Sequence, residues 1–226
     1  MPRQTPPGRV RDIARAACEV FIEKGYRRTL MTDVAGGRGS SALIEGEPGI
    51  GKSALVHAAI ADASRLGCQV FWGAGDELGQ ALPLLPMLDA LRVREPSPNP
   101  RRTTIVRLLR GELAANPGAD VSGALAEQLL ALVTEEATAR PTILVIDDLQ
   151  WADQATITLW GRLARSVAQV PLMLVGTMRP VPQRDELLAL RRTSSGACRL
   201  EHAQRPLCVV RERPEHQSAI AASLPG

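Results

Sequence analysis

The sequence predicts an α/β fold in which helices surround a mostly parallel β-sheet. Short apolar runs recur at residues 42–44, 68–72, 142–146 and 172–176, and stretches with helical spacing separate them. The run at 142–146 is continuously apolar and rich in β-branched residues, which is typical of a strand buried on both faces. Strands that alternate with helices favour parallel pairing with right-handed crossovers.

Length and composition limit the class of protein. The chain has 226 residues, of which 45% are hydrophobic, so it can bury a substantial core. Its formal net charge of +3 is too small to indicate a nucleic-acid or membrane partner by itself. No apolar run approaches the ~20 residues that a membrane span needs, and the first residues carry no apolar signal core. We therefore expect a cytoplasmic protein without a membrane partner.

Three segments follow one another along the chain. We expect residues 1–38 to form a short helical arm, because their apolar residues recur at helical spacing. The glycine-rich stretch Gly36–Gly39 then ends this pattern. Residues 39–192 predict the main domain. Its helices are expected at residues 52–66, 82–91, 104–113, 121–139, 155–168 and 185–192, with a proline-rich loop at 95–100. Residues 193–226 are polar and rich in Arg and Pro, so we expect an irregular C-terminal tail.

The main domain contains a phosphate-binding motif between its first strand and its first helix. Residues 46–53 match G-x-x-x-x-G-K-[ST] at every fixed position. Glycines let the backbone curl so that its N–H groups face phosphate oxygens, and the helix N-terminus favours the same anion. Lys52 adds a charge for the β- and γ-phosphates, and Ser53 offers a hydroxyl to Mg²⁺. The predicted nucleotide-binding residues are Gly46, Glu47, Pro48, Gly49, Ile50, Gly51, Lys52, Ser53 and Ala54.

Two acids follow the buried strand at residues 142–146. Ligands of α/β proteins bind at the carboxyl ends of the strands, where Asp147 and Asp148 emerge. Asp147 is expected to hold Mg²⁺ through water, together with Ser53. Asp148 is expected to orient or deprotonate an attacking water. The alternative is a strand that simply ends in a solvated acidic turn, and the phosphate motif upstream argues against it.

The strand at residues 172–176 ends in a second polar group. Thr177 could contact the attacking water, and Arg179 is a candidate catalytic residue that could reach the γ-phosphate. An arginine at a strand end is equally often a surface charge, so the sequence leaves both interpretations of Arg179 open. We expect Trp151 to pack against the following helix and Asp153 to cap it, and we assign neither to catalysis.

Four segments together resemble a known family. Glu45–Ser53, Gly73–Leu78, Asp147–Asp153 and Val175–Pro180 resemble, in order and spacing, the ATPase domain of the large ATP-binding regulators of the LuxR family, which are AAA-like signal-transduction ATPases. The resemblance covers roughly residues 39–192. It implies a three-layer P-loop NTPase fold, the cofactors ATP and Mg²⁺, and a switch with weak hydrolysis that reorganises neighbouring domains or subunits.

The family pattern is incomplete in this sequence. Family members are much longer, and they continue into a lid, a helical sensor region and a C-terminal helix-turn-helix. The resemblance therefore indicates a truncated or fused member. The family segment that helps to hold the nucleotide base is not recognisable before the first strand, so the base preference stays open.

The N-terminal arm resembles a different family. It is similar to the opening of a TetR-type DNA-binding domain through Ile13, Ala16, Ala17, Val20, Phe21, Glu23, Gly25, Tyr26, Thr29, Met31, Asp33, Val34 and Ala35. The recognition helix should follow, and a glycine-rich break stands in its place. Because base readout needs a helix in the major groove, we expect no sequence-specific DNA binding from this incomplete helix-turn-helix. The simpler alternative is an amphipathic helix packed on the main domain.

The leading hypothesis is a Mg·ATP-binding domain of a signal-responsive transcriptional regulator, and whether it hydrolyses ATP stays open. One rival is a TetR-like DNA-binding regulator whose arm contacts phosphates through Arg3, Arg9, Arg11, Arg27 and Arg28. The other rival is a non-functional fragment. A DNA-binding measurement tests the first rival, and a cooperative thermal transition tests the second.

Overall fold

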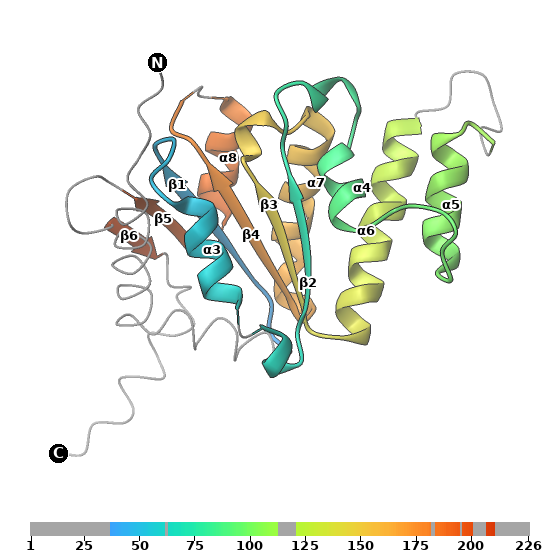
Figure 1. Ribbon diagram of the computed structural model, residues 1–226, viewed down its shortest axis with the longest axis horizontal. Coiled ribbons are helices and arrows are strands. Elements are labelled where there is room, and N and C mark those ends of the chain that lie inside the picture. The colour runs from blue at the N-terminus through green and yellow to red at the C-terminus, as the bar shows by residue number, and fades with distance from the viewer. Residues whose placement is uncertain are drawn as a thin grey trace.

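The strands of the chain form one sheet in the order β2-β3-β4-β1-β5-β6 (Figure 1). The computed structural model describes residues 37–61, 63–112, 121–181, 184–194, 196–200 and 207–210. The strands of these segments are β1 (Ser40–Gly46), β2 (Gln69–Ala74), β3 (Thr142–Asp147), β4 (Leu172–Met178), β5 (Gly196–Leu200) and β6 (Leu207–Val210). Pairing is parallel from β2 through to β5, and β6 pairs with β5 in the antiparallel direction. The predicted mostly parallel α/β sheet is confirmed.

Helices cover both faces of the sheet and create three layers. Side chains alternate between the two faces of each strand, so neighbouring residues enter different cores. Ile143 and Val145 of β3 pack with Leu55 and Val56 of α3 (Lys52–Ile60). Leu144 and the other alternate positions face the larger core formed by α4 (Leu85–Ala90), α6 (Val121–Ala139), α7 (Gln154–Ser166) and α8 (Asp185–Thr193).

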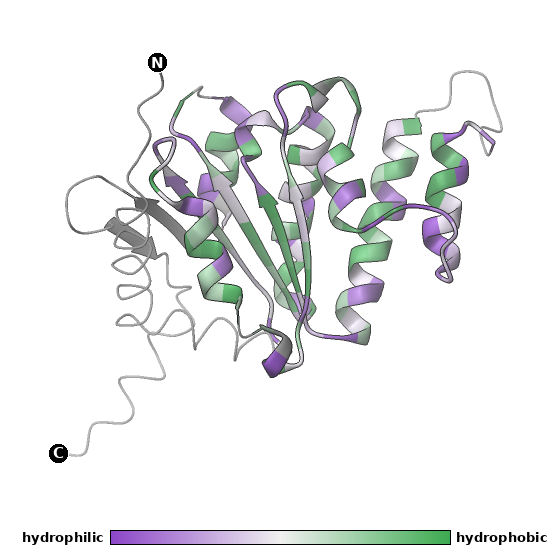
Figure 2. Ribbon diagram, in the orientation of Figure 1, coloured by the Kyte–Doolittle hydropathy of each residue, from purple (hydrophilic) through white to green (hydrophobic). Residues whose placement is uncertain are grey.

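The helices lie on opposite faces of the sheet in Figures 1 and 2. In Figure 1, α3 lies in front of the sheet, and α7 and α8 lie behind it. Figure 2 shows apolar residues running along β3, which is buried between the two layers. None of the helices in the described segments is long and apolar enough to cross a membrane.

Several element boundaries differ from the sequence prediction. The helix predicted over residues 52–66 ends at Ile60, and a 3₁₀ turn (η1, Ala63–Leu66) follows it. The helix predicted to begin at residue 104 begins at Pro100, since α5 spans Pro100–Leu109. The Asn99 side chain accepts hydrogen bonds from the N–H groups of Arg101 (2.8 Å) and Arg102 (3.3 Å), which caps the helix four residues earlier than apolar spacing suggested.

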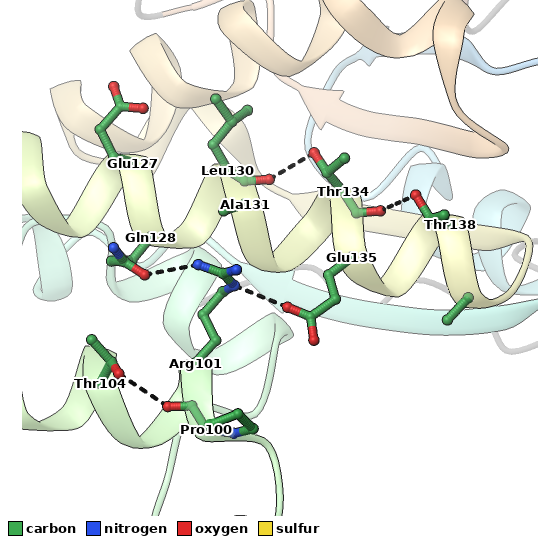
Figure 3. A pocket seen from close by; sticks show the side chains of 11 residues that line it. Pro100, Arg101, Thr104, Glu127, Gln128, Leu130, Ala131, Thr134, Glu135 and Thr138 are labelled. Atoms are coloured by element: carbon green, nitrogen blue, oxygen red, sulfur yellow. Dashed lines mark hydrogen bonds and ion pairs between the residues drawn. The ribbon is translucent and has the colours of Figure 1, made fainter.

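Helices α5 and α6 pack against each other, and a pocket is lined by side chains of both helices (Figure 3). Arg101 of α5 joins the two helices, because it donates to Glu135 (2.9 Å) and Gln128 (3.0 Å) of α6. The hydroxyls of Thr134 and Thr138 donate hydrogen bonds to backbone carbonyl oxygens of α6 itself. Glu127, which also lines the pocket, pairs instead with Arg162 of α7 (2.7 Å), so the polar groups of the pocket already have protein partners.

The prediction for the C-terminal segment is wrong in part. Strands β5 and β6 lie within residues 193–226, which the sequence predicts to be irregular. Strand β5 pairs with β6 and with β1, and β1 lies about 150 residues earlier in the chain, a pairing that local sequence patterns do not reveal. The TetR-like arm with Arg3, Arg9, Arg11, Arg27 and Arg28 lies outside the described residues, except for Gly37 and Arg38.

Candidate nucleotide-binding site

The loop at residues 46–53 connects β1 with α3, and glycines set its shape. Gly49 (φ 74°) and Gly51 (φ 100°) adopt left-handed conformations that are costly for residues with a side chain. Ile50 is buried in the core beneath α3 and anchors the loop, while Glu47, Pro48 and Gly49 are exposed. The loop is therefore anchored in the core at Ile50 and exposed to solvent at residues 47–49.

Helix α3 begins at Lys52 and presents its N-terminus to the space that the loop encloses. Gly51 precedes it and provides no side-chain cap. The first N–H groups of a helix have no partner within the helix, and the helix dipole adds a positive partial charge there. The N–H groups of Lys52, Ser53 and Ala54 thus form a site suited to an anion such as phosphate.

The side chain of Lys52 lies against the loop itself. It is only 6% exposed, and its Nζ donates to the carbonyl oxygens of Gly46 (2.9 Å) and Glu47 (3.2 Å). Burial lowers the pKa of the Lys52 ammonium below its ordinary value of 10.5, while the nearby carboxylate of Asp148 raises it and the guanidinium of Arg179 lowers it. Lys52, Asp148 and Arg179 therefore share one electrostatic neighbourhood.

Strand order brings the two acids next to the loop. Strand β4 lies between β1 and β3, so the carboxyl ends of these three strands meet at one edge of the sheet. The Thr177 hydroxyl at the end of β4 donates to Oδ1 of Asp147 and accepts a hydrogen bond from the N–H of Asp148 (2.9 Å). One buried hydroxyl thus holds the carboxylate of Asp147 and the main chain of Asp148, whereas the sequence suggested a water contact for Thr177.

Asp148 has an unusual backbone conformation. Its φ of 52° and ψ of 50° lie in the left-handed region, which is uncommon for residues other than glycine and occurs often at functional sites. The Gln150 side chain donates to Oδ1 of Asp148 (2.8 Å) and accepts from the N–H of Arg179 (2.9 Å). Gln150 is not among the predicted site residues, because a glutamine that follows two acids in a loop normally indicates an exposed residue.

Arg179 lies at the site and forms loose contacts there. Its Nε is 3.8 Å from Oδ1 of Asp148, and its guanidinium carbon is 5.7 Å from the centroid of the Trp151 ring. The Nε atom is buried and has no hydrogen-bond partner within the described part of the chain. A buried guanidinium nitrogen without a partner is well suited to receive an additional anion.

Hydrogen bonds hold the main chain on both sides of the turn that follows Asp147 and Asp148. Asp153 caps α7 as expected, because its carboxylate accepts from the N–H of Thr156 (2.9 Å). Arg184 donates to the carbonyl oxygen of Ala152 (2.6 Å). On the other side, the N–H of Gly75 donates to the carbonyl oxygen of Asp147 (2.8 Å). The main chain around the acids is thus held by the N–H of Gly75, directly after β2, and by the side chain of Arg184, directly before α8.

The residues present fit a magnesium-bound triphosphate. The loop supplies N–H groups and the Lys52 ammonium for phosphate oxygens. The Ser53 hydroxyl and the Asp147 carboxylate are oxygen ligands of the kind that Mg²⁺ takes alongside phosphate oxygens and water. The partnerless Nε of Arg179 faces the same edge of the sheet. No part of this donor set suits a soft metal or a neutral apolar ligand.

Comparison with known proteins identifies the family. A family model described as the AAA ATPase domain matches residues 28–175 of the chain. The chain belongs to this AAA ATPase family. The loop at residues 46–53 and both acids fall inside the matched region, whereas Thr177 and Arg179 lie just beyond it. The chain therefore contains an AAA-type P-loop ATPase domain, as the resemblance implied.

Individual relatives of this AAA domain are distant. An uncharacterised protein of Rhizobium meliloti is 26% identical over 224 residues. The alignment covers 86% of this chain, which spans only 22% of the length of that relative. The structure of Drosophila ORC bound to AT-rich DNA and Cdc6 is 14% identical, with a TM-score of 0.42 and coverage of 86% of this chain and 56% of that chain. The flagellar accessory protein FlaH of Methanocaldococcus jannaschii is 17% identical, with a TM-score of 0.37 and coverage of 81% and 84%.

Proposed function

We propose that this AAA domain binds Mg·ATP, hydrolyses it slowly, and thereby switches a signal-responsive transcriptional regulator between two states. The convergence of Lys52, Asp147, Asp148 and Arg179 at one edge of the sheet carries the proposal. These residues come from segments up to 127 positions apart, counted from Lys52 to Arg179. Together they provide a phosphate-binding charge, a metal ligand, a base and a second cation.

In this proposal, the loop holds the phosphates and the acids hold the metal and the water. The N–H groups of the loop, all of residues 46–54 except Pro48, and the Lys52 ammonium bind the β- and γ-phosphates. Ser53 and Asp147 would hold Mg²⁺, which would supply positive charge to offset the negative charge of the phosphate oxygens. Lys52 would exchange the loop carbonyls that it contacts in this structure for phosphate oxygens.

Asp148 and Arg179 carry the chemical step. Asp148 accepts the proton of the attacking water, for which its position at the strand end is suited. Arg179 stabilises charge on the γ-phosphate, and its Nε is available for this role because it has no hydrogen-bond partner among the described residues. The loose ion pair between Arg179 and Asp148 (3.8 Å) must open when the γ-phosphate arrives.

The regulatory role rests on the resemblance to LuxR-type regulators. Segments around Glu45–Ser53, Gly73–Leu78, Asp147–Asp153 and Val175–Pro180 support it by their order and spacing. In such a switch, the free energy difference between the ATP-bound and free states reorganises neighbouring domains or subunits. Cytoplasmic location belongs to the same proposal.

A thermal melt with and without Mg·ATP tests nucleotide binding. A ligand at 100 times its Kd stabilises the native state by about 2.7 kcal/mol. For a domain of this size we expect the melting temperature to rise by about 5–11 °C. The rise should be absent in Lys52→Ala and present in Arg107→Ala, which removes an exposed positive charge on α5 instead. An unchanged melting temperature in the wild type, or an equal rise in Lys52→Ala, contradicts the proposal.

The regulatory role needs a separate experiment in the source organism. Lys52→Ala is placed in the chromosomal copy, and transcript levels are compared with those of the parent strain under several growth conditions. We expect a defined set of transcripts to change. Identical transcript profiles, with wild-type protein levels in both strains, contradict a role in transcription and leave the nucleotide-binding result unaffected.

A further inference from the structure

Gln150 is a buried polar side chain that joins the ends of two neighbouring strands. It is 1% exposed and lies in the 3₁₀ turn η3 (Leu149–Trp151), directly after the acids. Its Nε2 donates to Oδ1 of Asp148 at the end of β3, and its Oε1 accepts from the N–H of Arg179 at the end of β4. Burying an amide is favourable only when its polar atoms are paired, and here both ends have partners.

The orientation of this amide follows from its partners. The carboxylate of Asp148 accepts hydrogen bonds only, and the N–H of Arg179 donates only. Turning the amide by 180° would place its oxygen against the carboxylate and its NH₂ against the N–H group, so both contacts would become repulsive. The side chain of Gln150 is therefore held in a single orientation. Its hydrogen bond to Oδ1 in turn restrains the carboxylate of Asp148.

The contacts of Asp148 are concentrated on one oxygen. Oδ1 accepts from Gln150 at 2.8 Å and lies 3.8 Å from Nε of Arg179. This fixes the rotation of the carboxyl group about its bond to Cβ and leaves the direction of Oδ2 defined. The left-handed backbone of Asp148 and the Thr177 hydroxyl fix the main chain of the same residue.

We propose that Gln150 is a positioning residue that orients the carboxylate of Asp148 toward the attacking water and couples that orientation to the end of β4. The inference rests on the proposed function, in which Asp148 acts as the base. Gln150 itself touches neither phosphate nor water in this role. When Arg179 turns to the γ-phosphate, its N–H keeps the bond to Gln150, so Asp148 stays aligned after the ion pair opens.

The test compares Gln150→Met and Gln150→Asn with Gln154→Met. Methionine fills a similar volume without the two hydrogen bonds, and asparagine keeps the amide but is one carbon too short to reach both partners. Gln154 is the control because it is an exposed glutamine in the same segment, and its amide oxygen faces Arg184 (3.3 Å). Each purified chain is measured for Mg·ATP affinity, for single-turnover hydrolysis, and for hydrogen exchange of the Arg179 amide.

Orientation of a general base contributes part of the roughly 10²–10⁴-fold effect of general-base catalysis. We therefore expect both Gln150 variants to hydrolyse bound ATP at least about tenfold more slowly, with Mg·ATP affinity within about threefold of the wild type. The Arg179 amide should exchange faster in both variants and at the wild-type rate in Gln154→Met. The exchange result does not depend on nucleotide.

Several results would contradict the positioning role of Gln150. Wild-type hydrolysis in both Gln150 variants shows that Asp148 needs no positioning by Gln150, and an unprotected Arg179 amide in the wild type removes the structural link. A chain that binds Mg·ATP without any turnover has no base to position. A wild-type chain that binds no Mg·ATP refutes the proposed function itself, and the affinity measurement identifies that case before any variant is compared.

Discussion

Thr177 allows a direct test of how the two acids are held. Its hydroxyl bonds both to Oδ1 of Asp147 and to the N–H of Asp148 (2.9 Å). The side chain is 0% exposed, so Thr177→Val replaces the hydroxyl by a methyl group of similar size and removes both hydrogen bonds. Thr177→Ser is the matched control, because it keeps the hydroxyl and loses only a methyl group.

The expected loss of stability follows from these two bonds. A neutral hydrogen bond contributes about 1 kcal/mol, and one to a charged group contributes about 1.5–3 kcal/mol. Asp147 and Asp148 are only partly buried, so water replaces some of the lost bonding. We expect Thr177→Val to lower the free energy of unfolding by about 1–3 kcal/mol, which is less than the full sum of the two bonds. For a domain of this size, the melting temperature should fall by about 2–12 °C.

The assay combines urea unfolding at 25 °C with titration of Mg²⁺ in the presence of ATP. The intrinsic fluorescence of the three tryptophans reports unfolding. Groups that orient a metal ligand typically change metal affinity by about 10–100-fold when they are removed. Thr177→Val should therefore need at least about tenfold more Mg²⁺ for half-maximal ATP binding. Thr177→Ser should stay close to the wild type in this titration.

Two results would refute the reasoning. One is the same Mg²⁺ dependence in the valine and serine variants, which would mean that Asp147 is held correctly without the hydroxyl. The other is a valine variant as stable as the wild type, which would mean that neither hydrogen bond contributes to folding. Neither result bears on the phosphate loop, since Lys52 does not contact Thr177 in any of its hydrogen bonds.

Two further substitutions test contacts that hold the sheet edge at Asp147 and Asp148. Gly75→Ala would place a Cβ 2.5 Å from the carbonyl oxygen of Asp148, so we expect a loss of about 1–3 kcal/mol in urea unfolding. Gly161→Ala, where the nearest neighbour is a movable leucine side-chain atom, is the control and should be near neutral. Asp153→Ala removes the cap on the N–H of Thr156 and should cost about 1 kcal/mol in the same assay; an unchanged urea midpoint in either Gly75→Ala or Asp153→Ala would contradict the corresponding contact.

Local patterns in the sequence were sufficient for much of the fold. Strand β3 is apolar from Ile143 to Ile146 because both of its faces are buried, and α6 begins and ends at the predicted residues 121 and 139. The phosphate motif is a run of eight positions whose spacing can be read without any partner. The family match over residues 28–175 confirms the ATPase domain that these patterns predicted. The LuxR-type regulatory role and the boundaries of the three segments stay predictions.

Apolar patterns failed where hydrogen bonds, and not apolar spacing, define an element. Strand β5 lies in a segment without periodicity, and it pairs with β1, far earlier in the chain, and with β6. Helix α5 begins at Pro100, because the side chain of Asn99 caps it, although apolar spacing starts later. In both cases the hydrogen bonds, and not the apolar pattern, set the element.

The sequence by itself determined that a phosphate loop, two acids and an arginine exist at strand ends. Only the tertiary structure decided how they are connected. It placed Thr177 between the acids and buried Gln150 between Asp148 and the N–H of Arg179, a residue 29 positions later in the chain. The physical reason is that hydrogen bonds depend on distance and direction in space, and these are set by the order of the strands in the sheet.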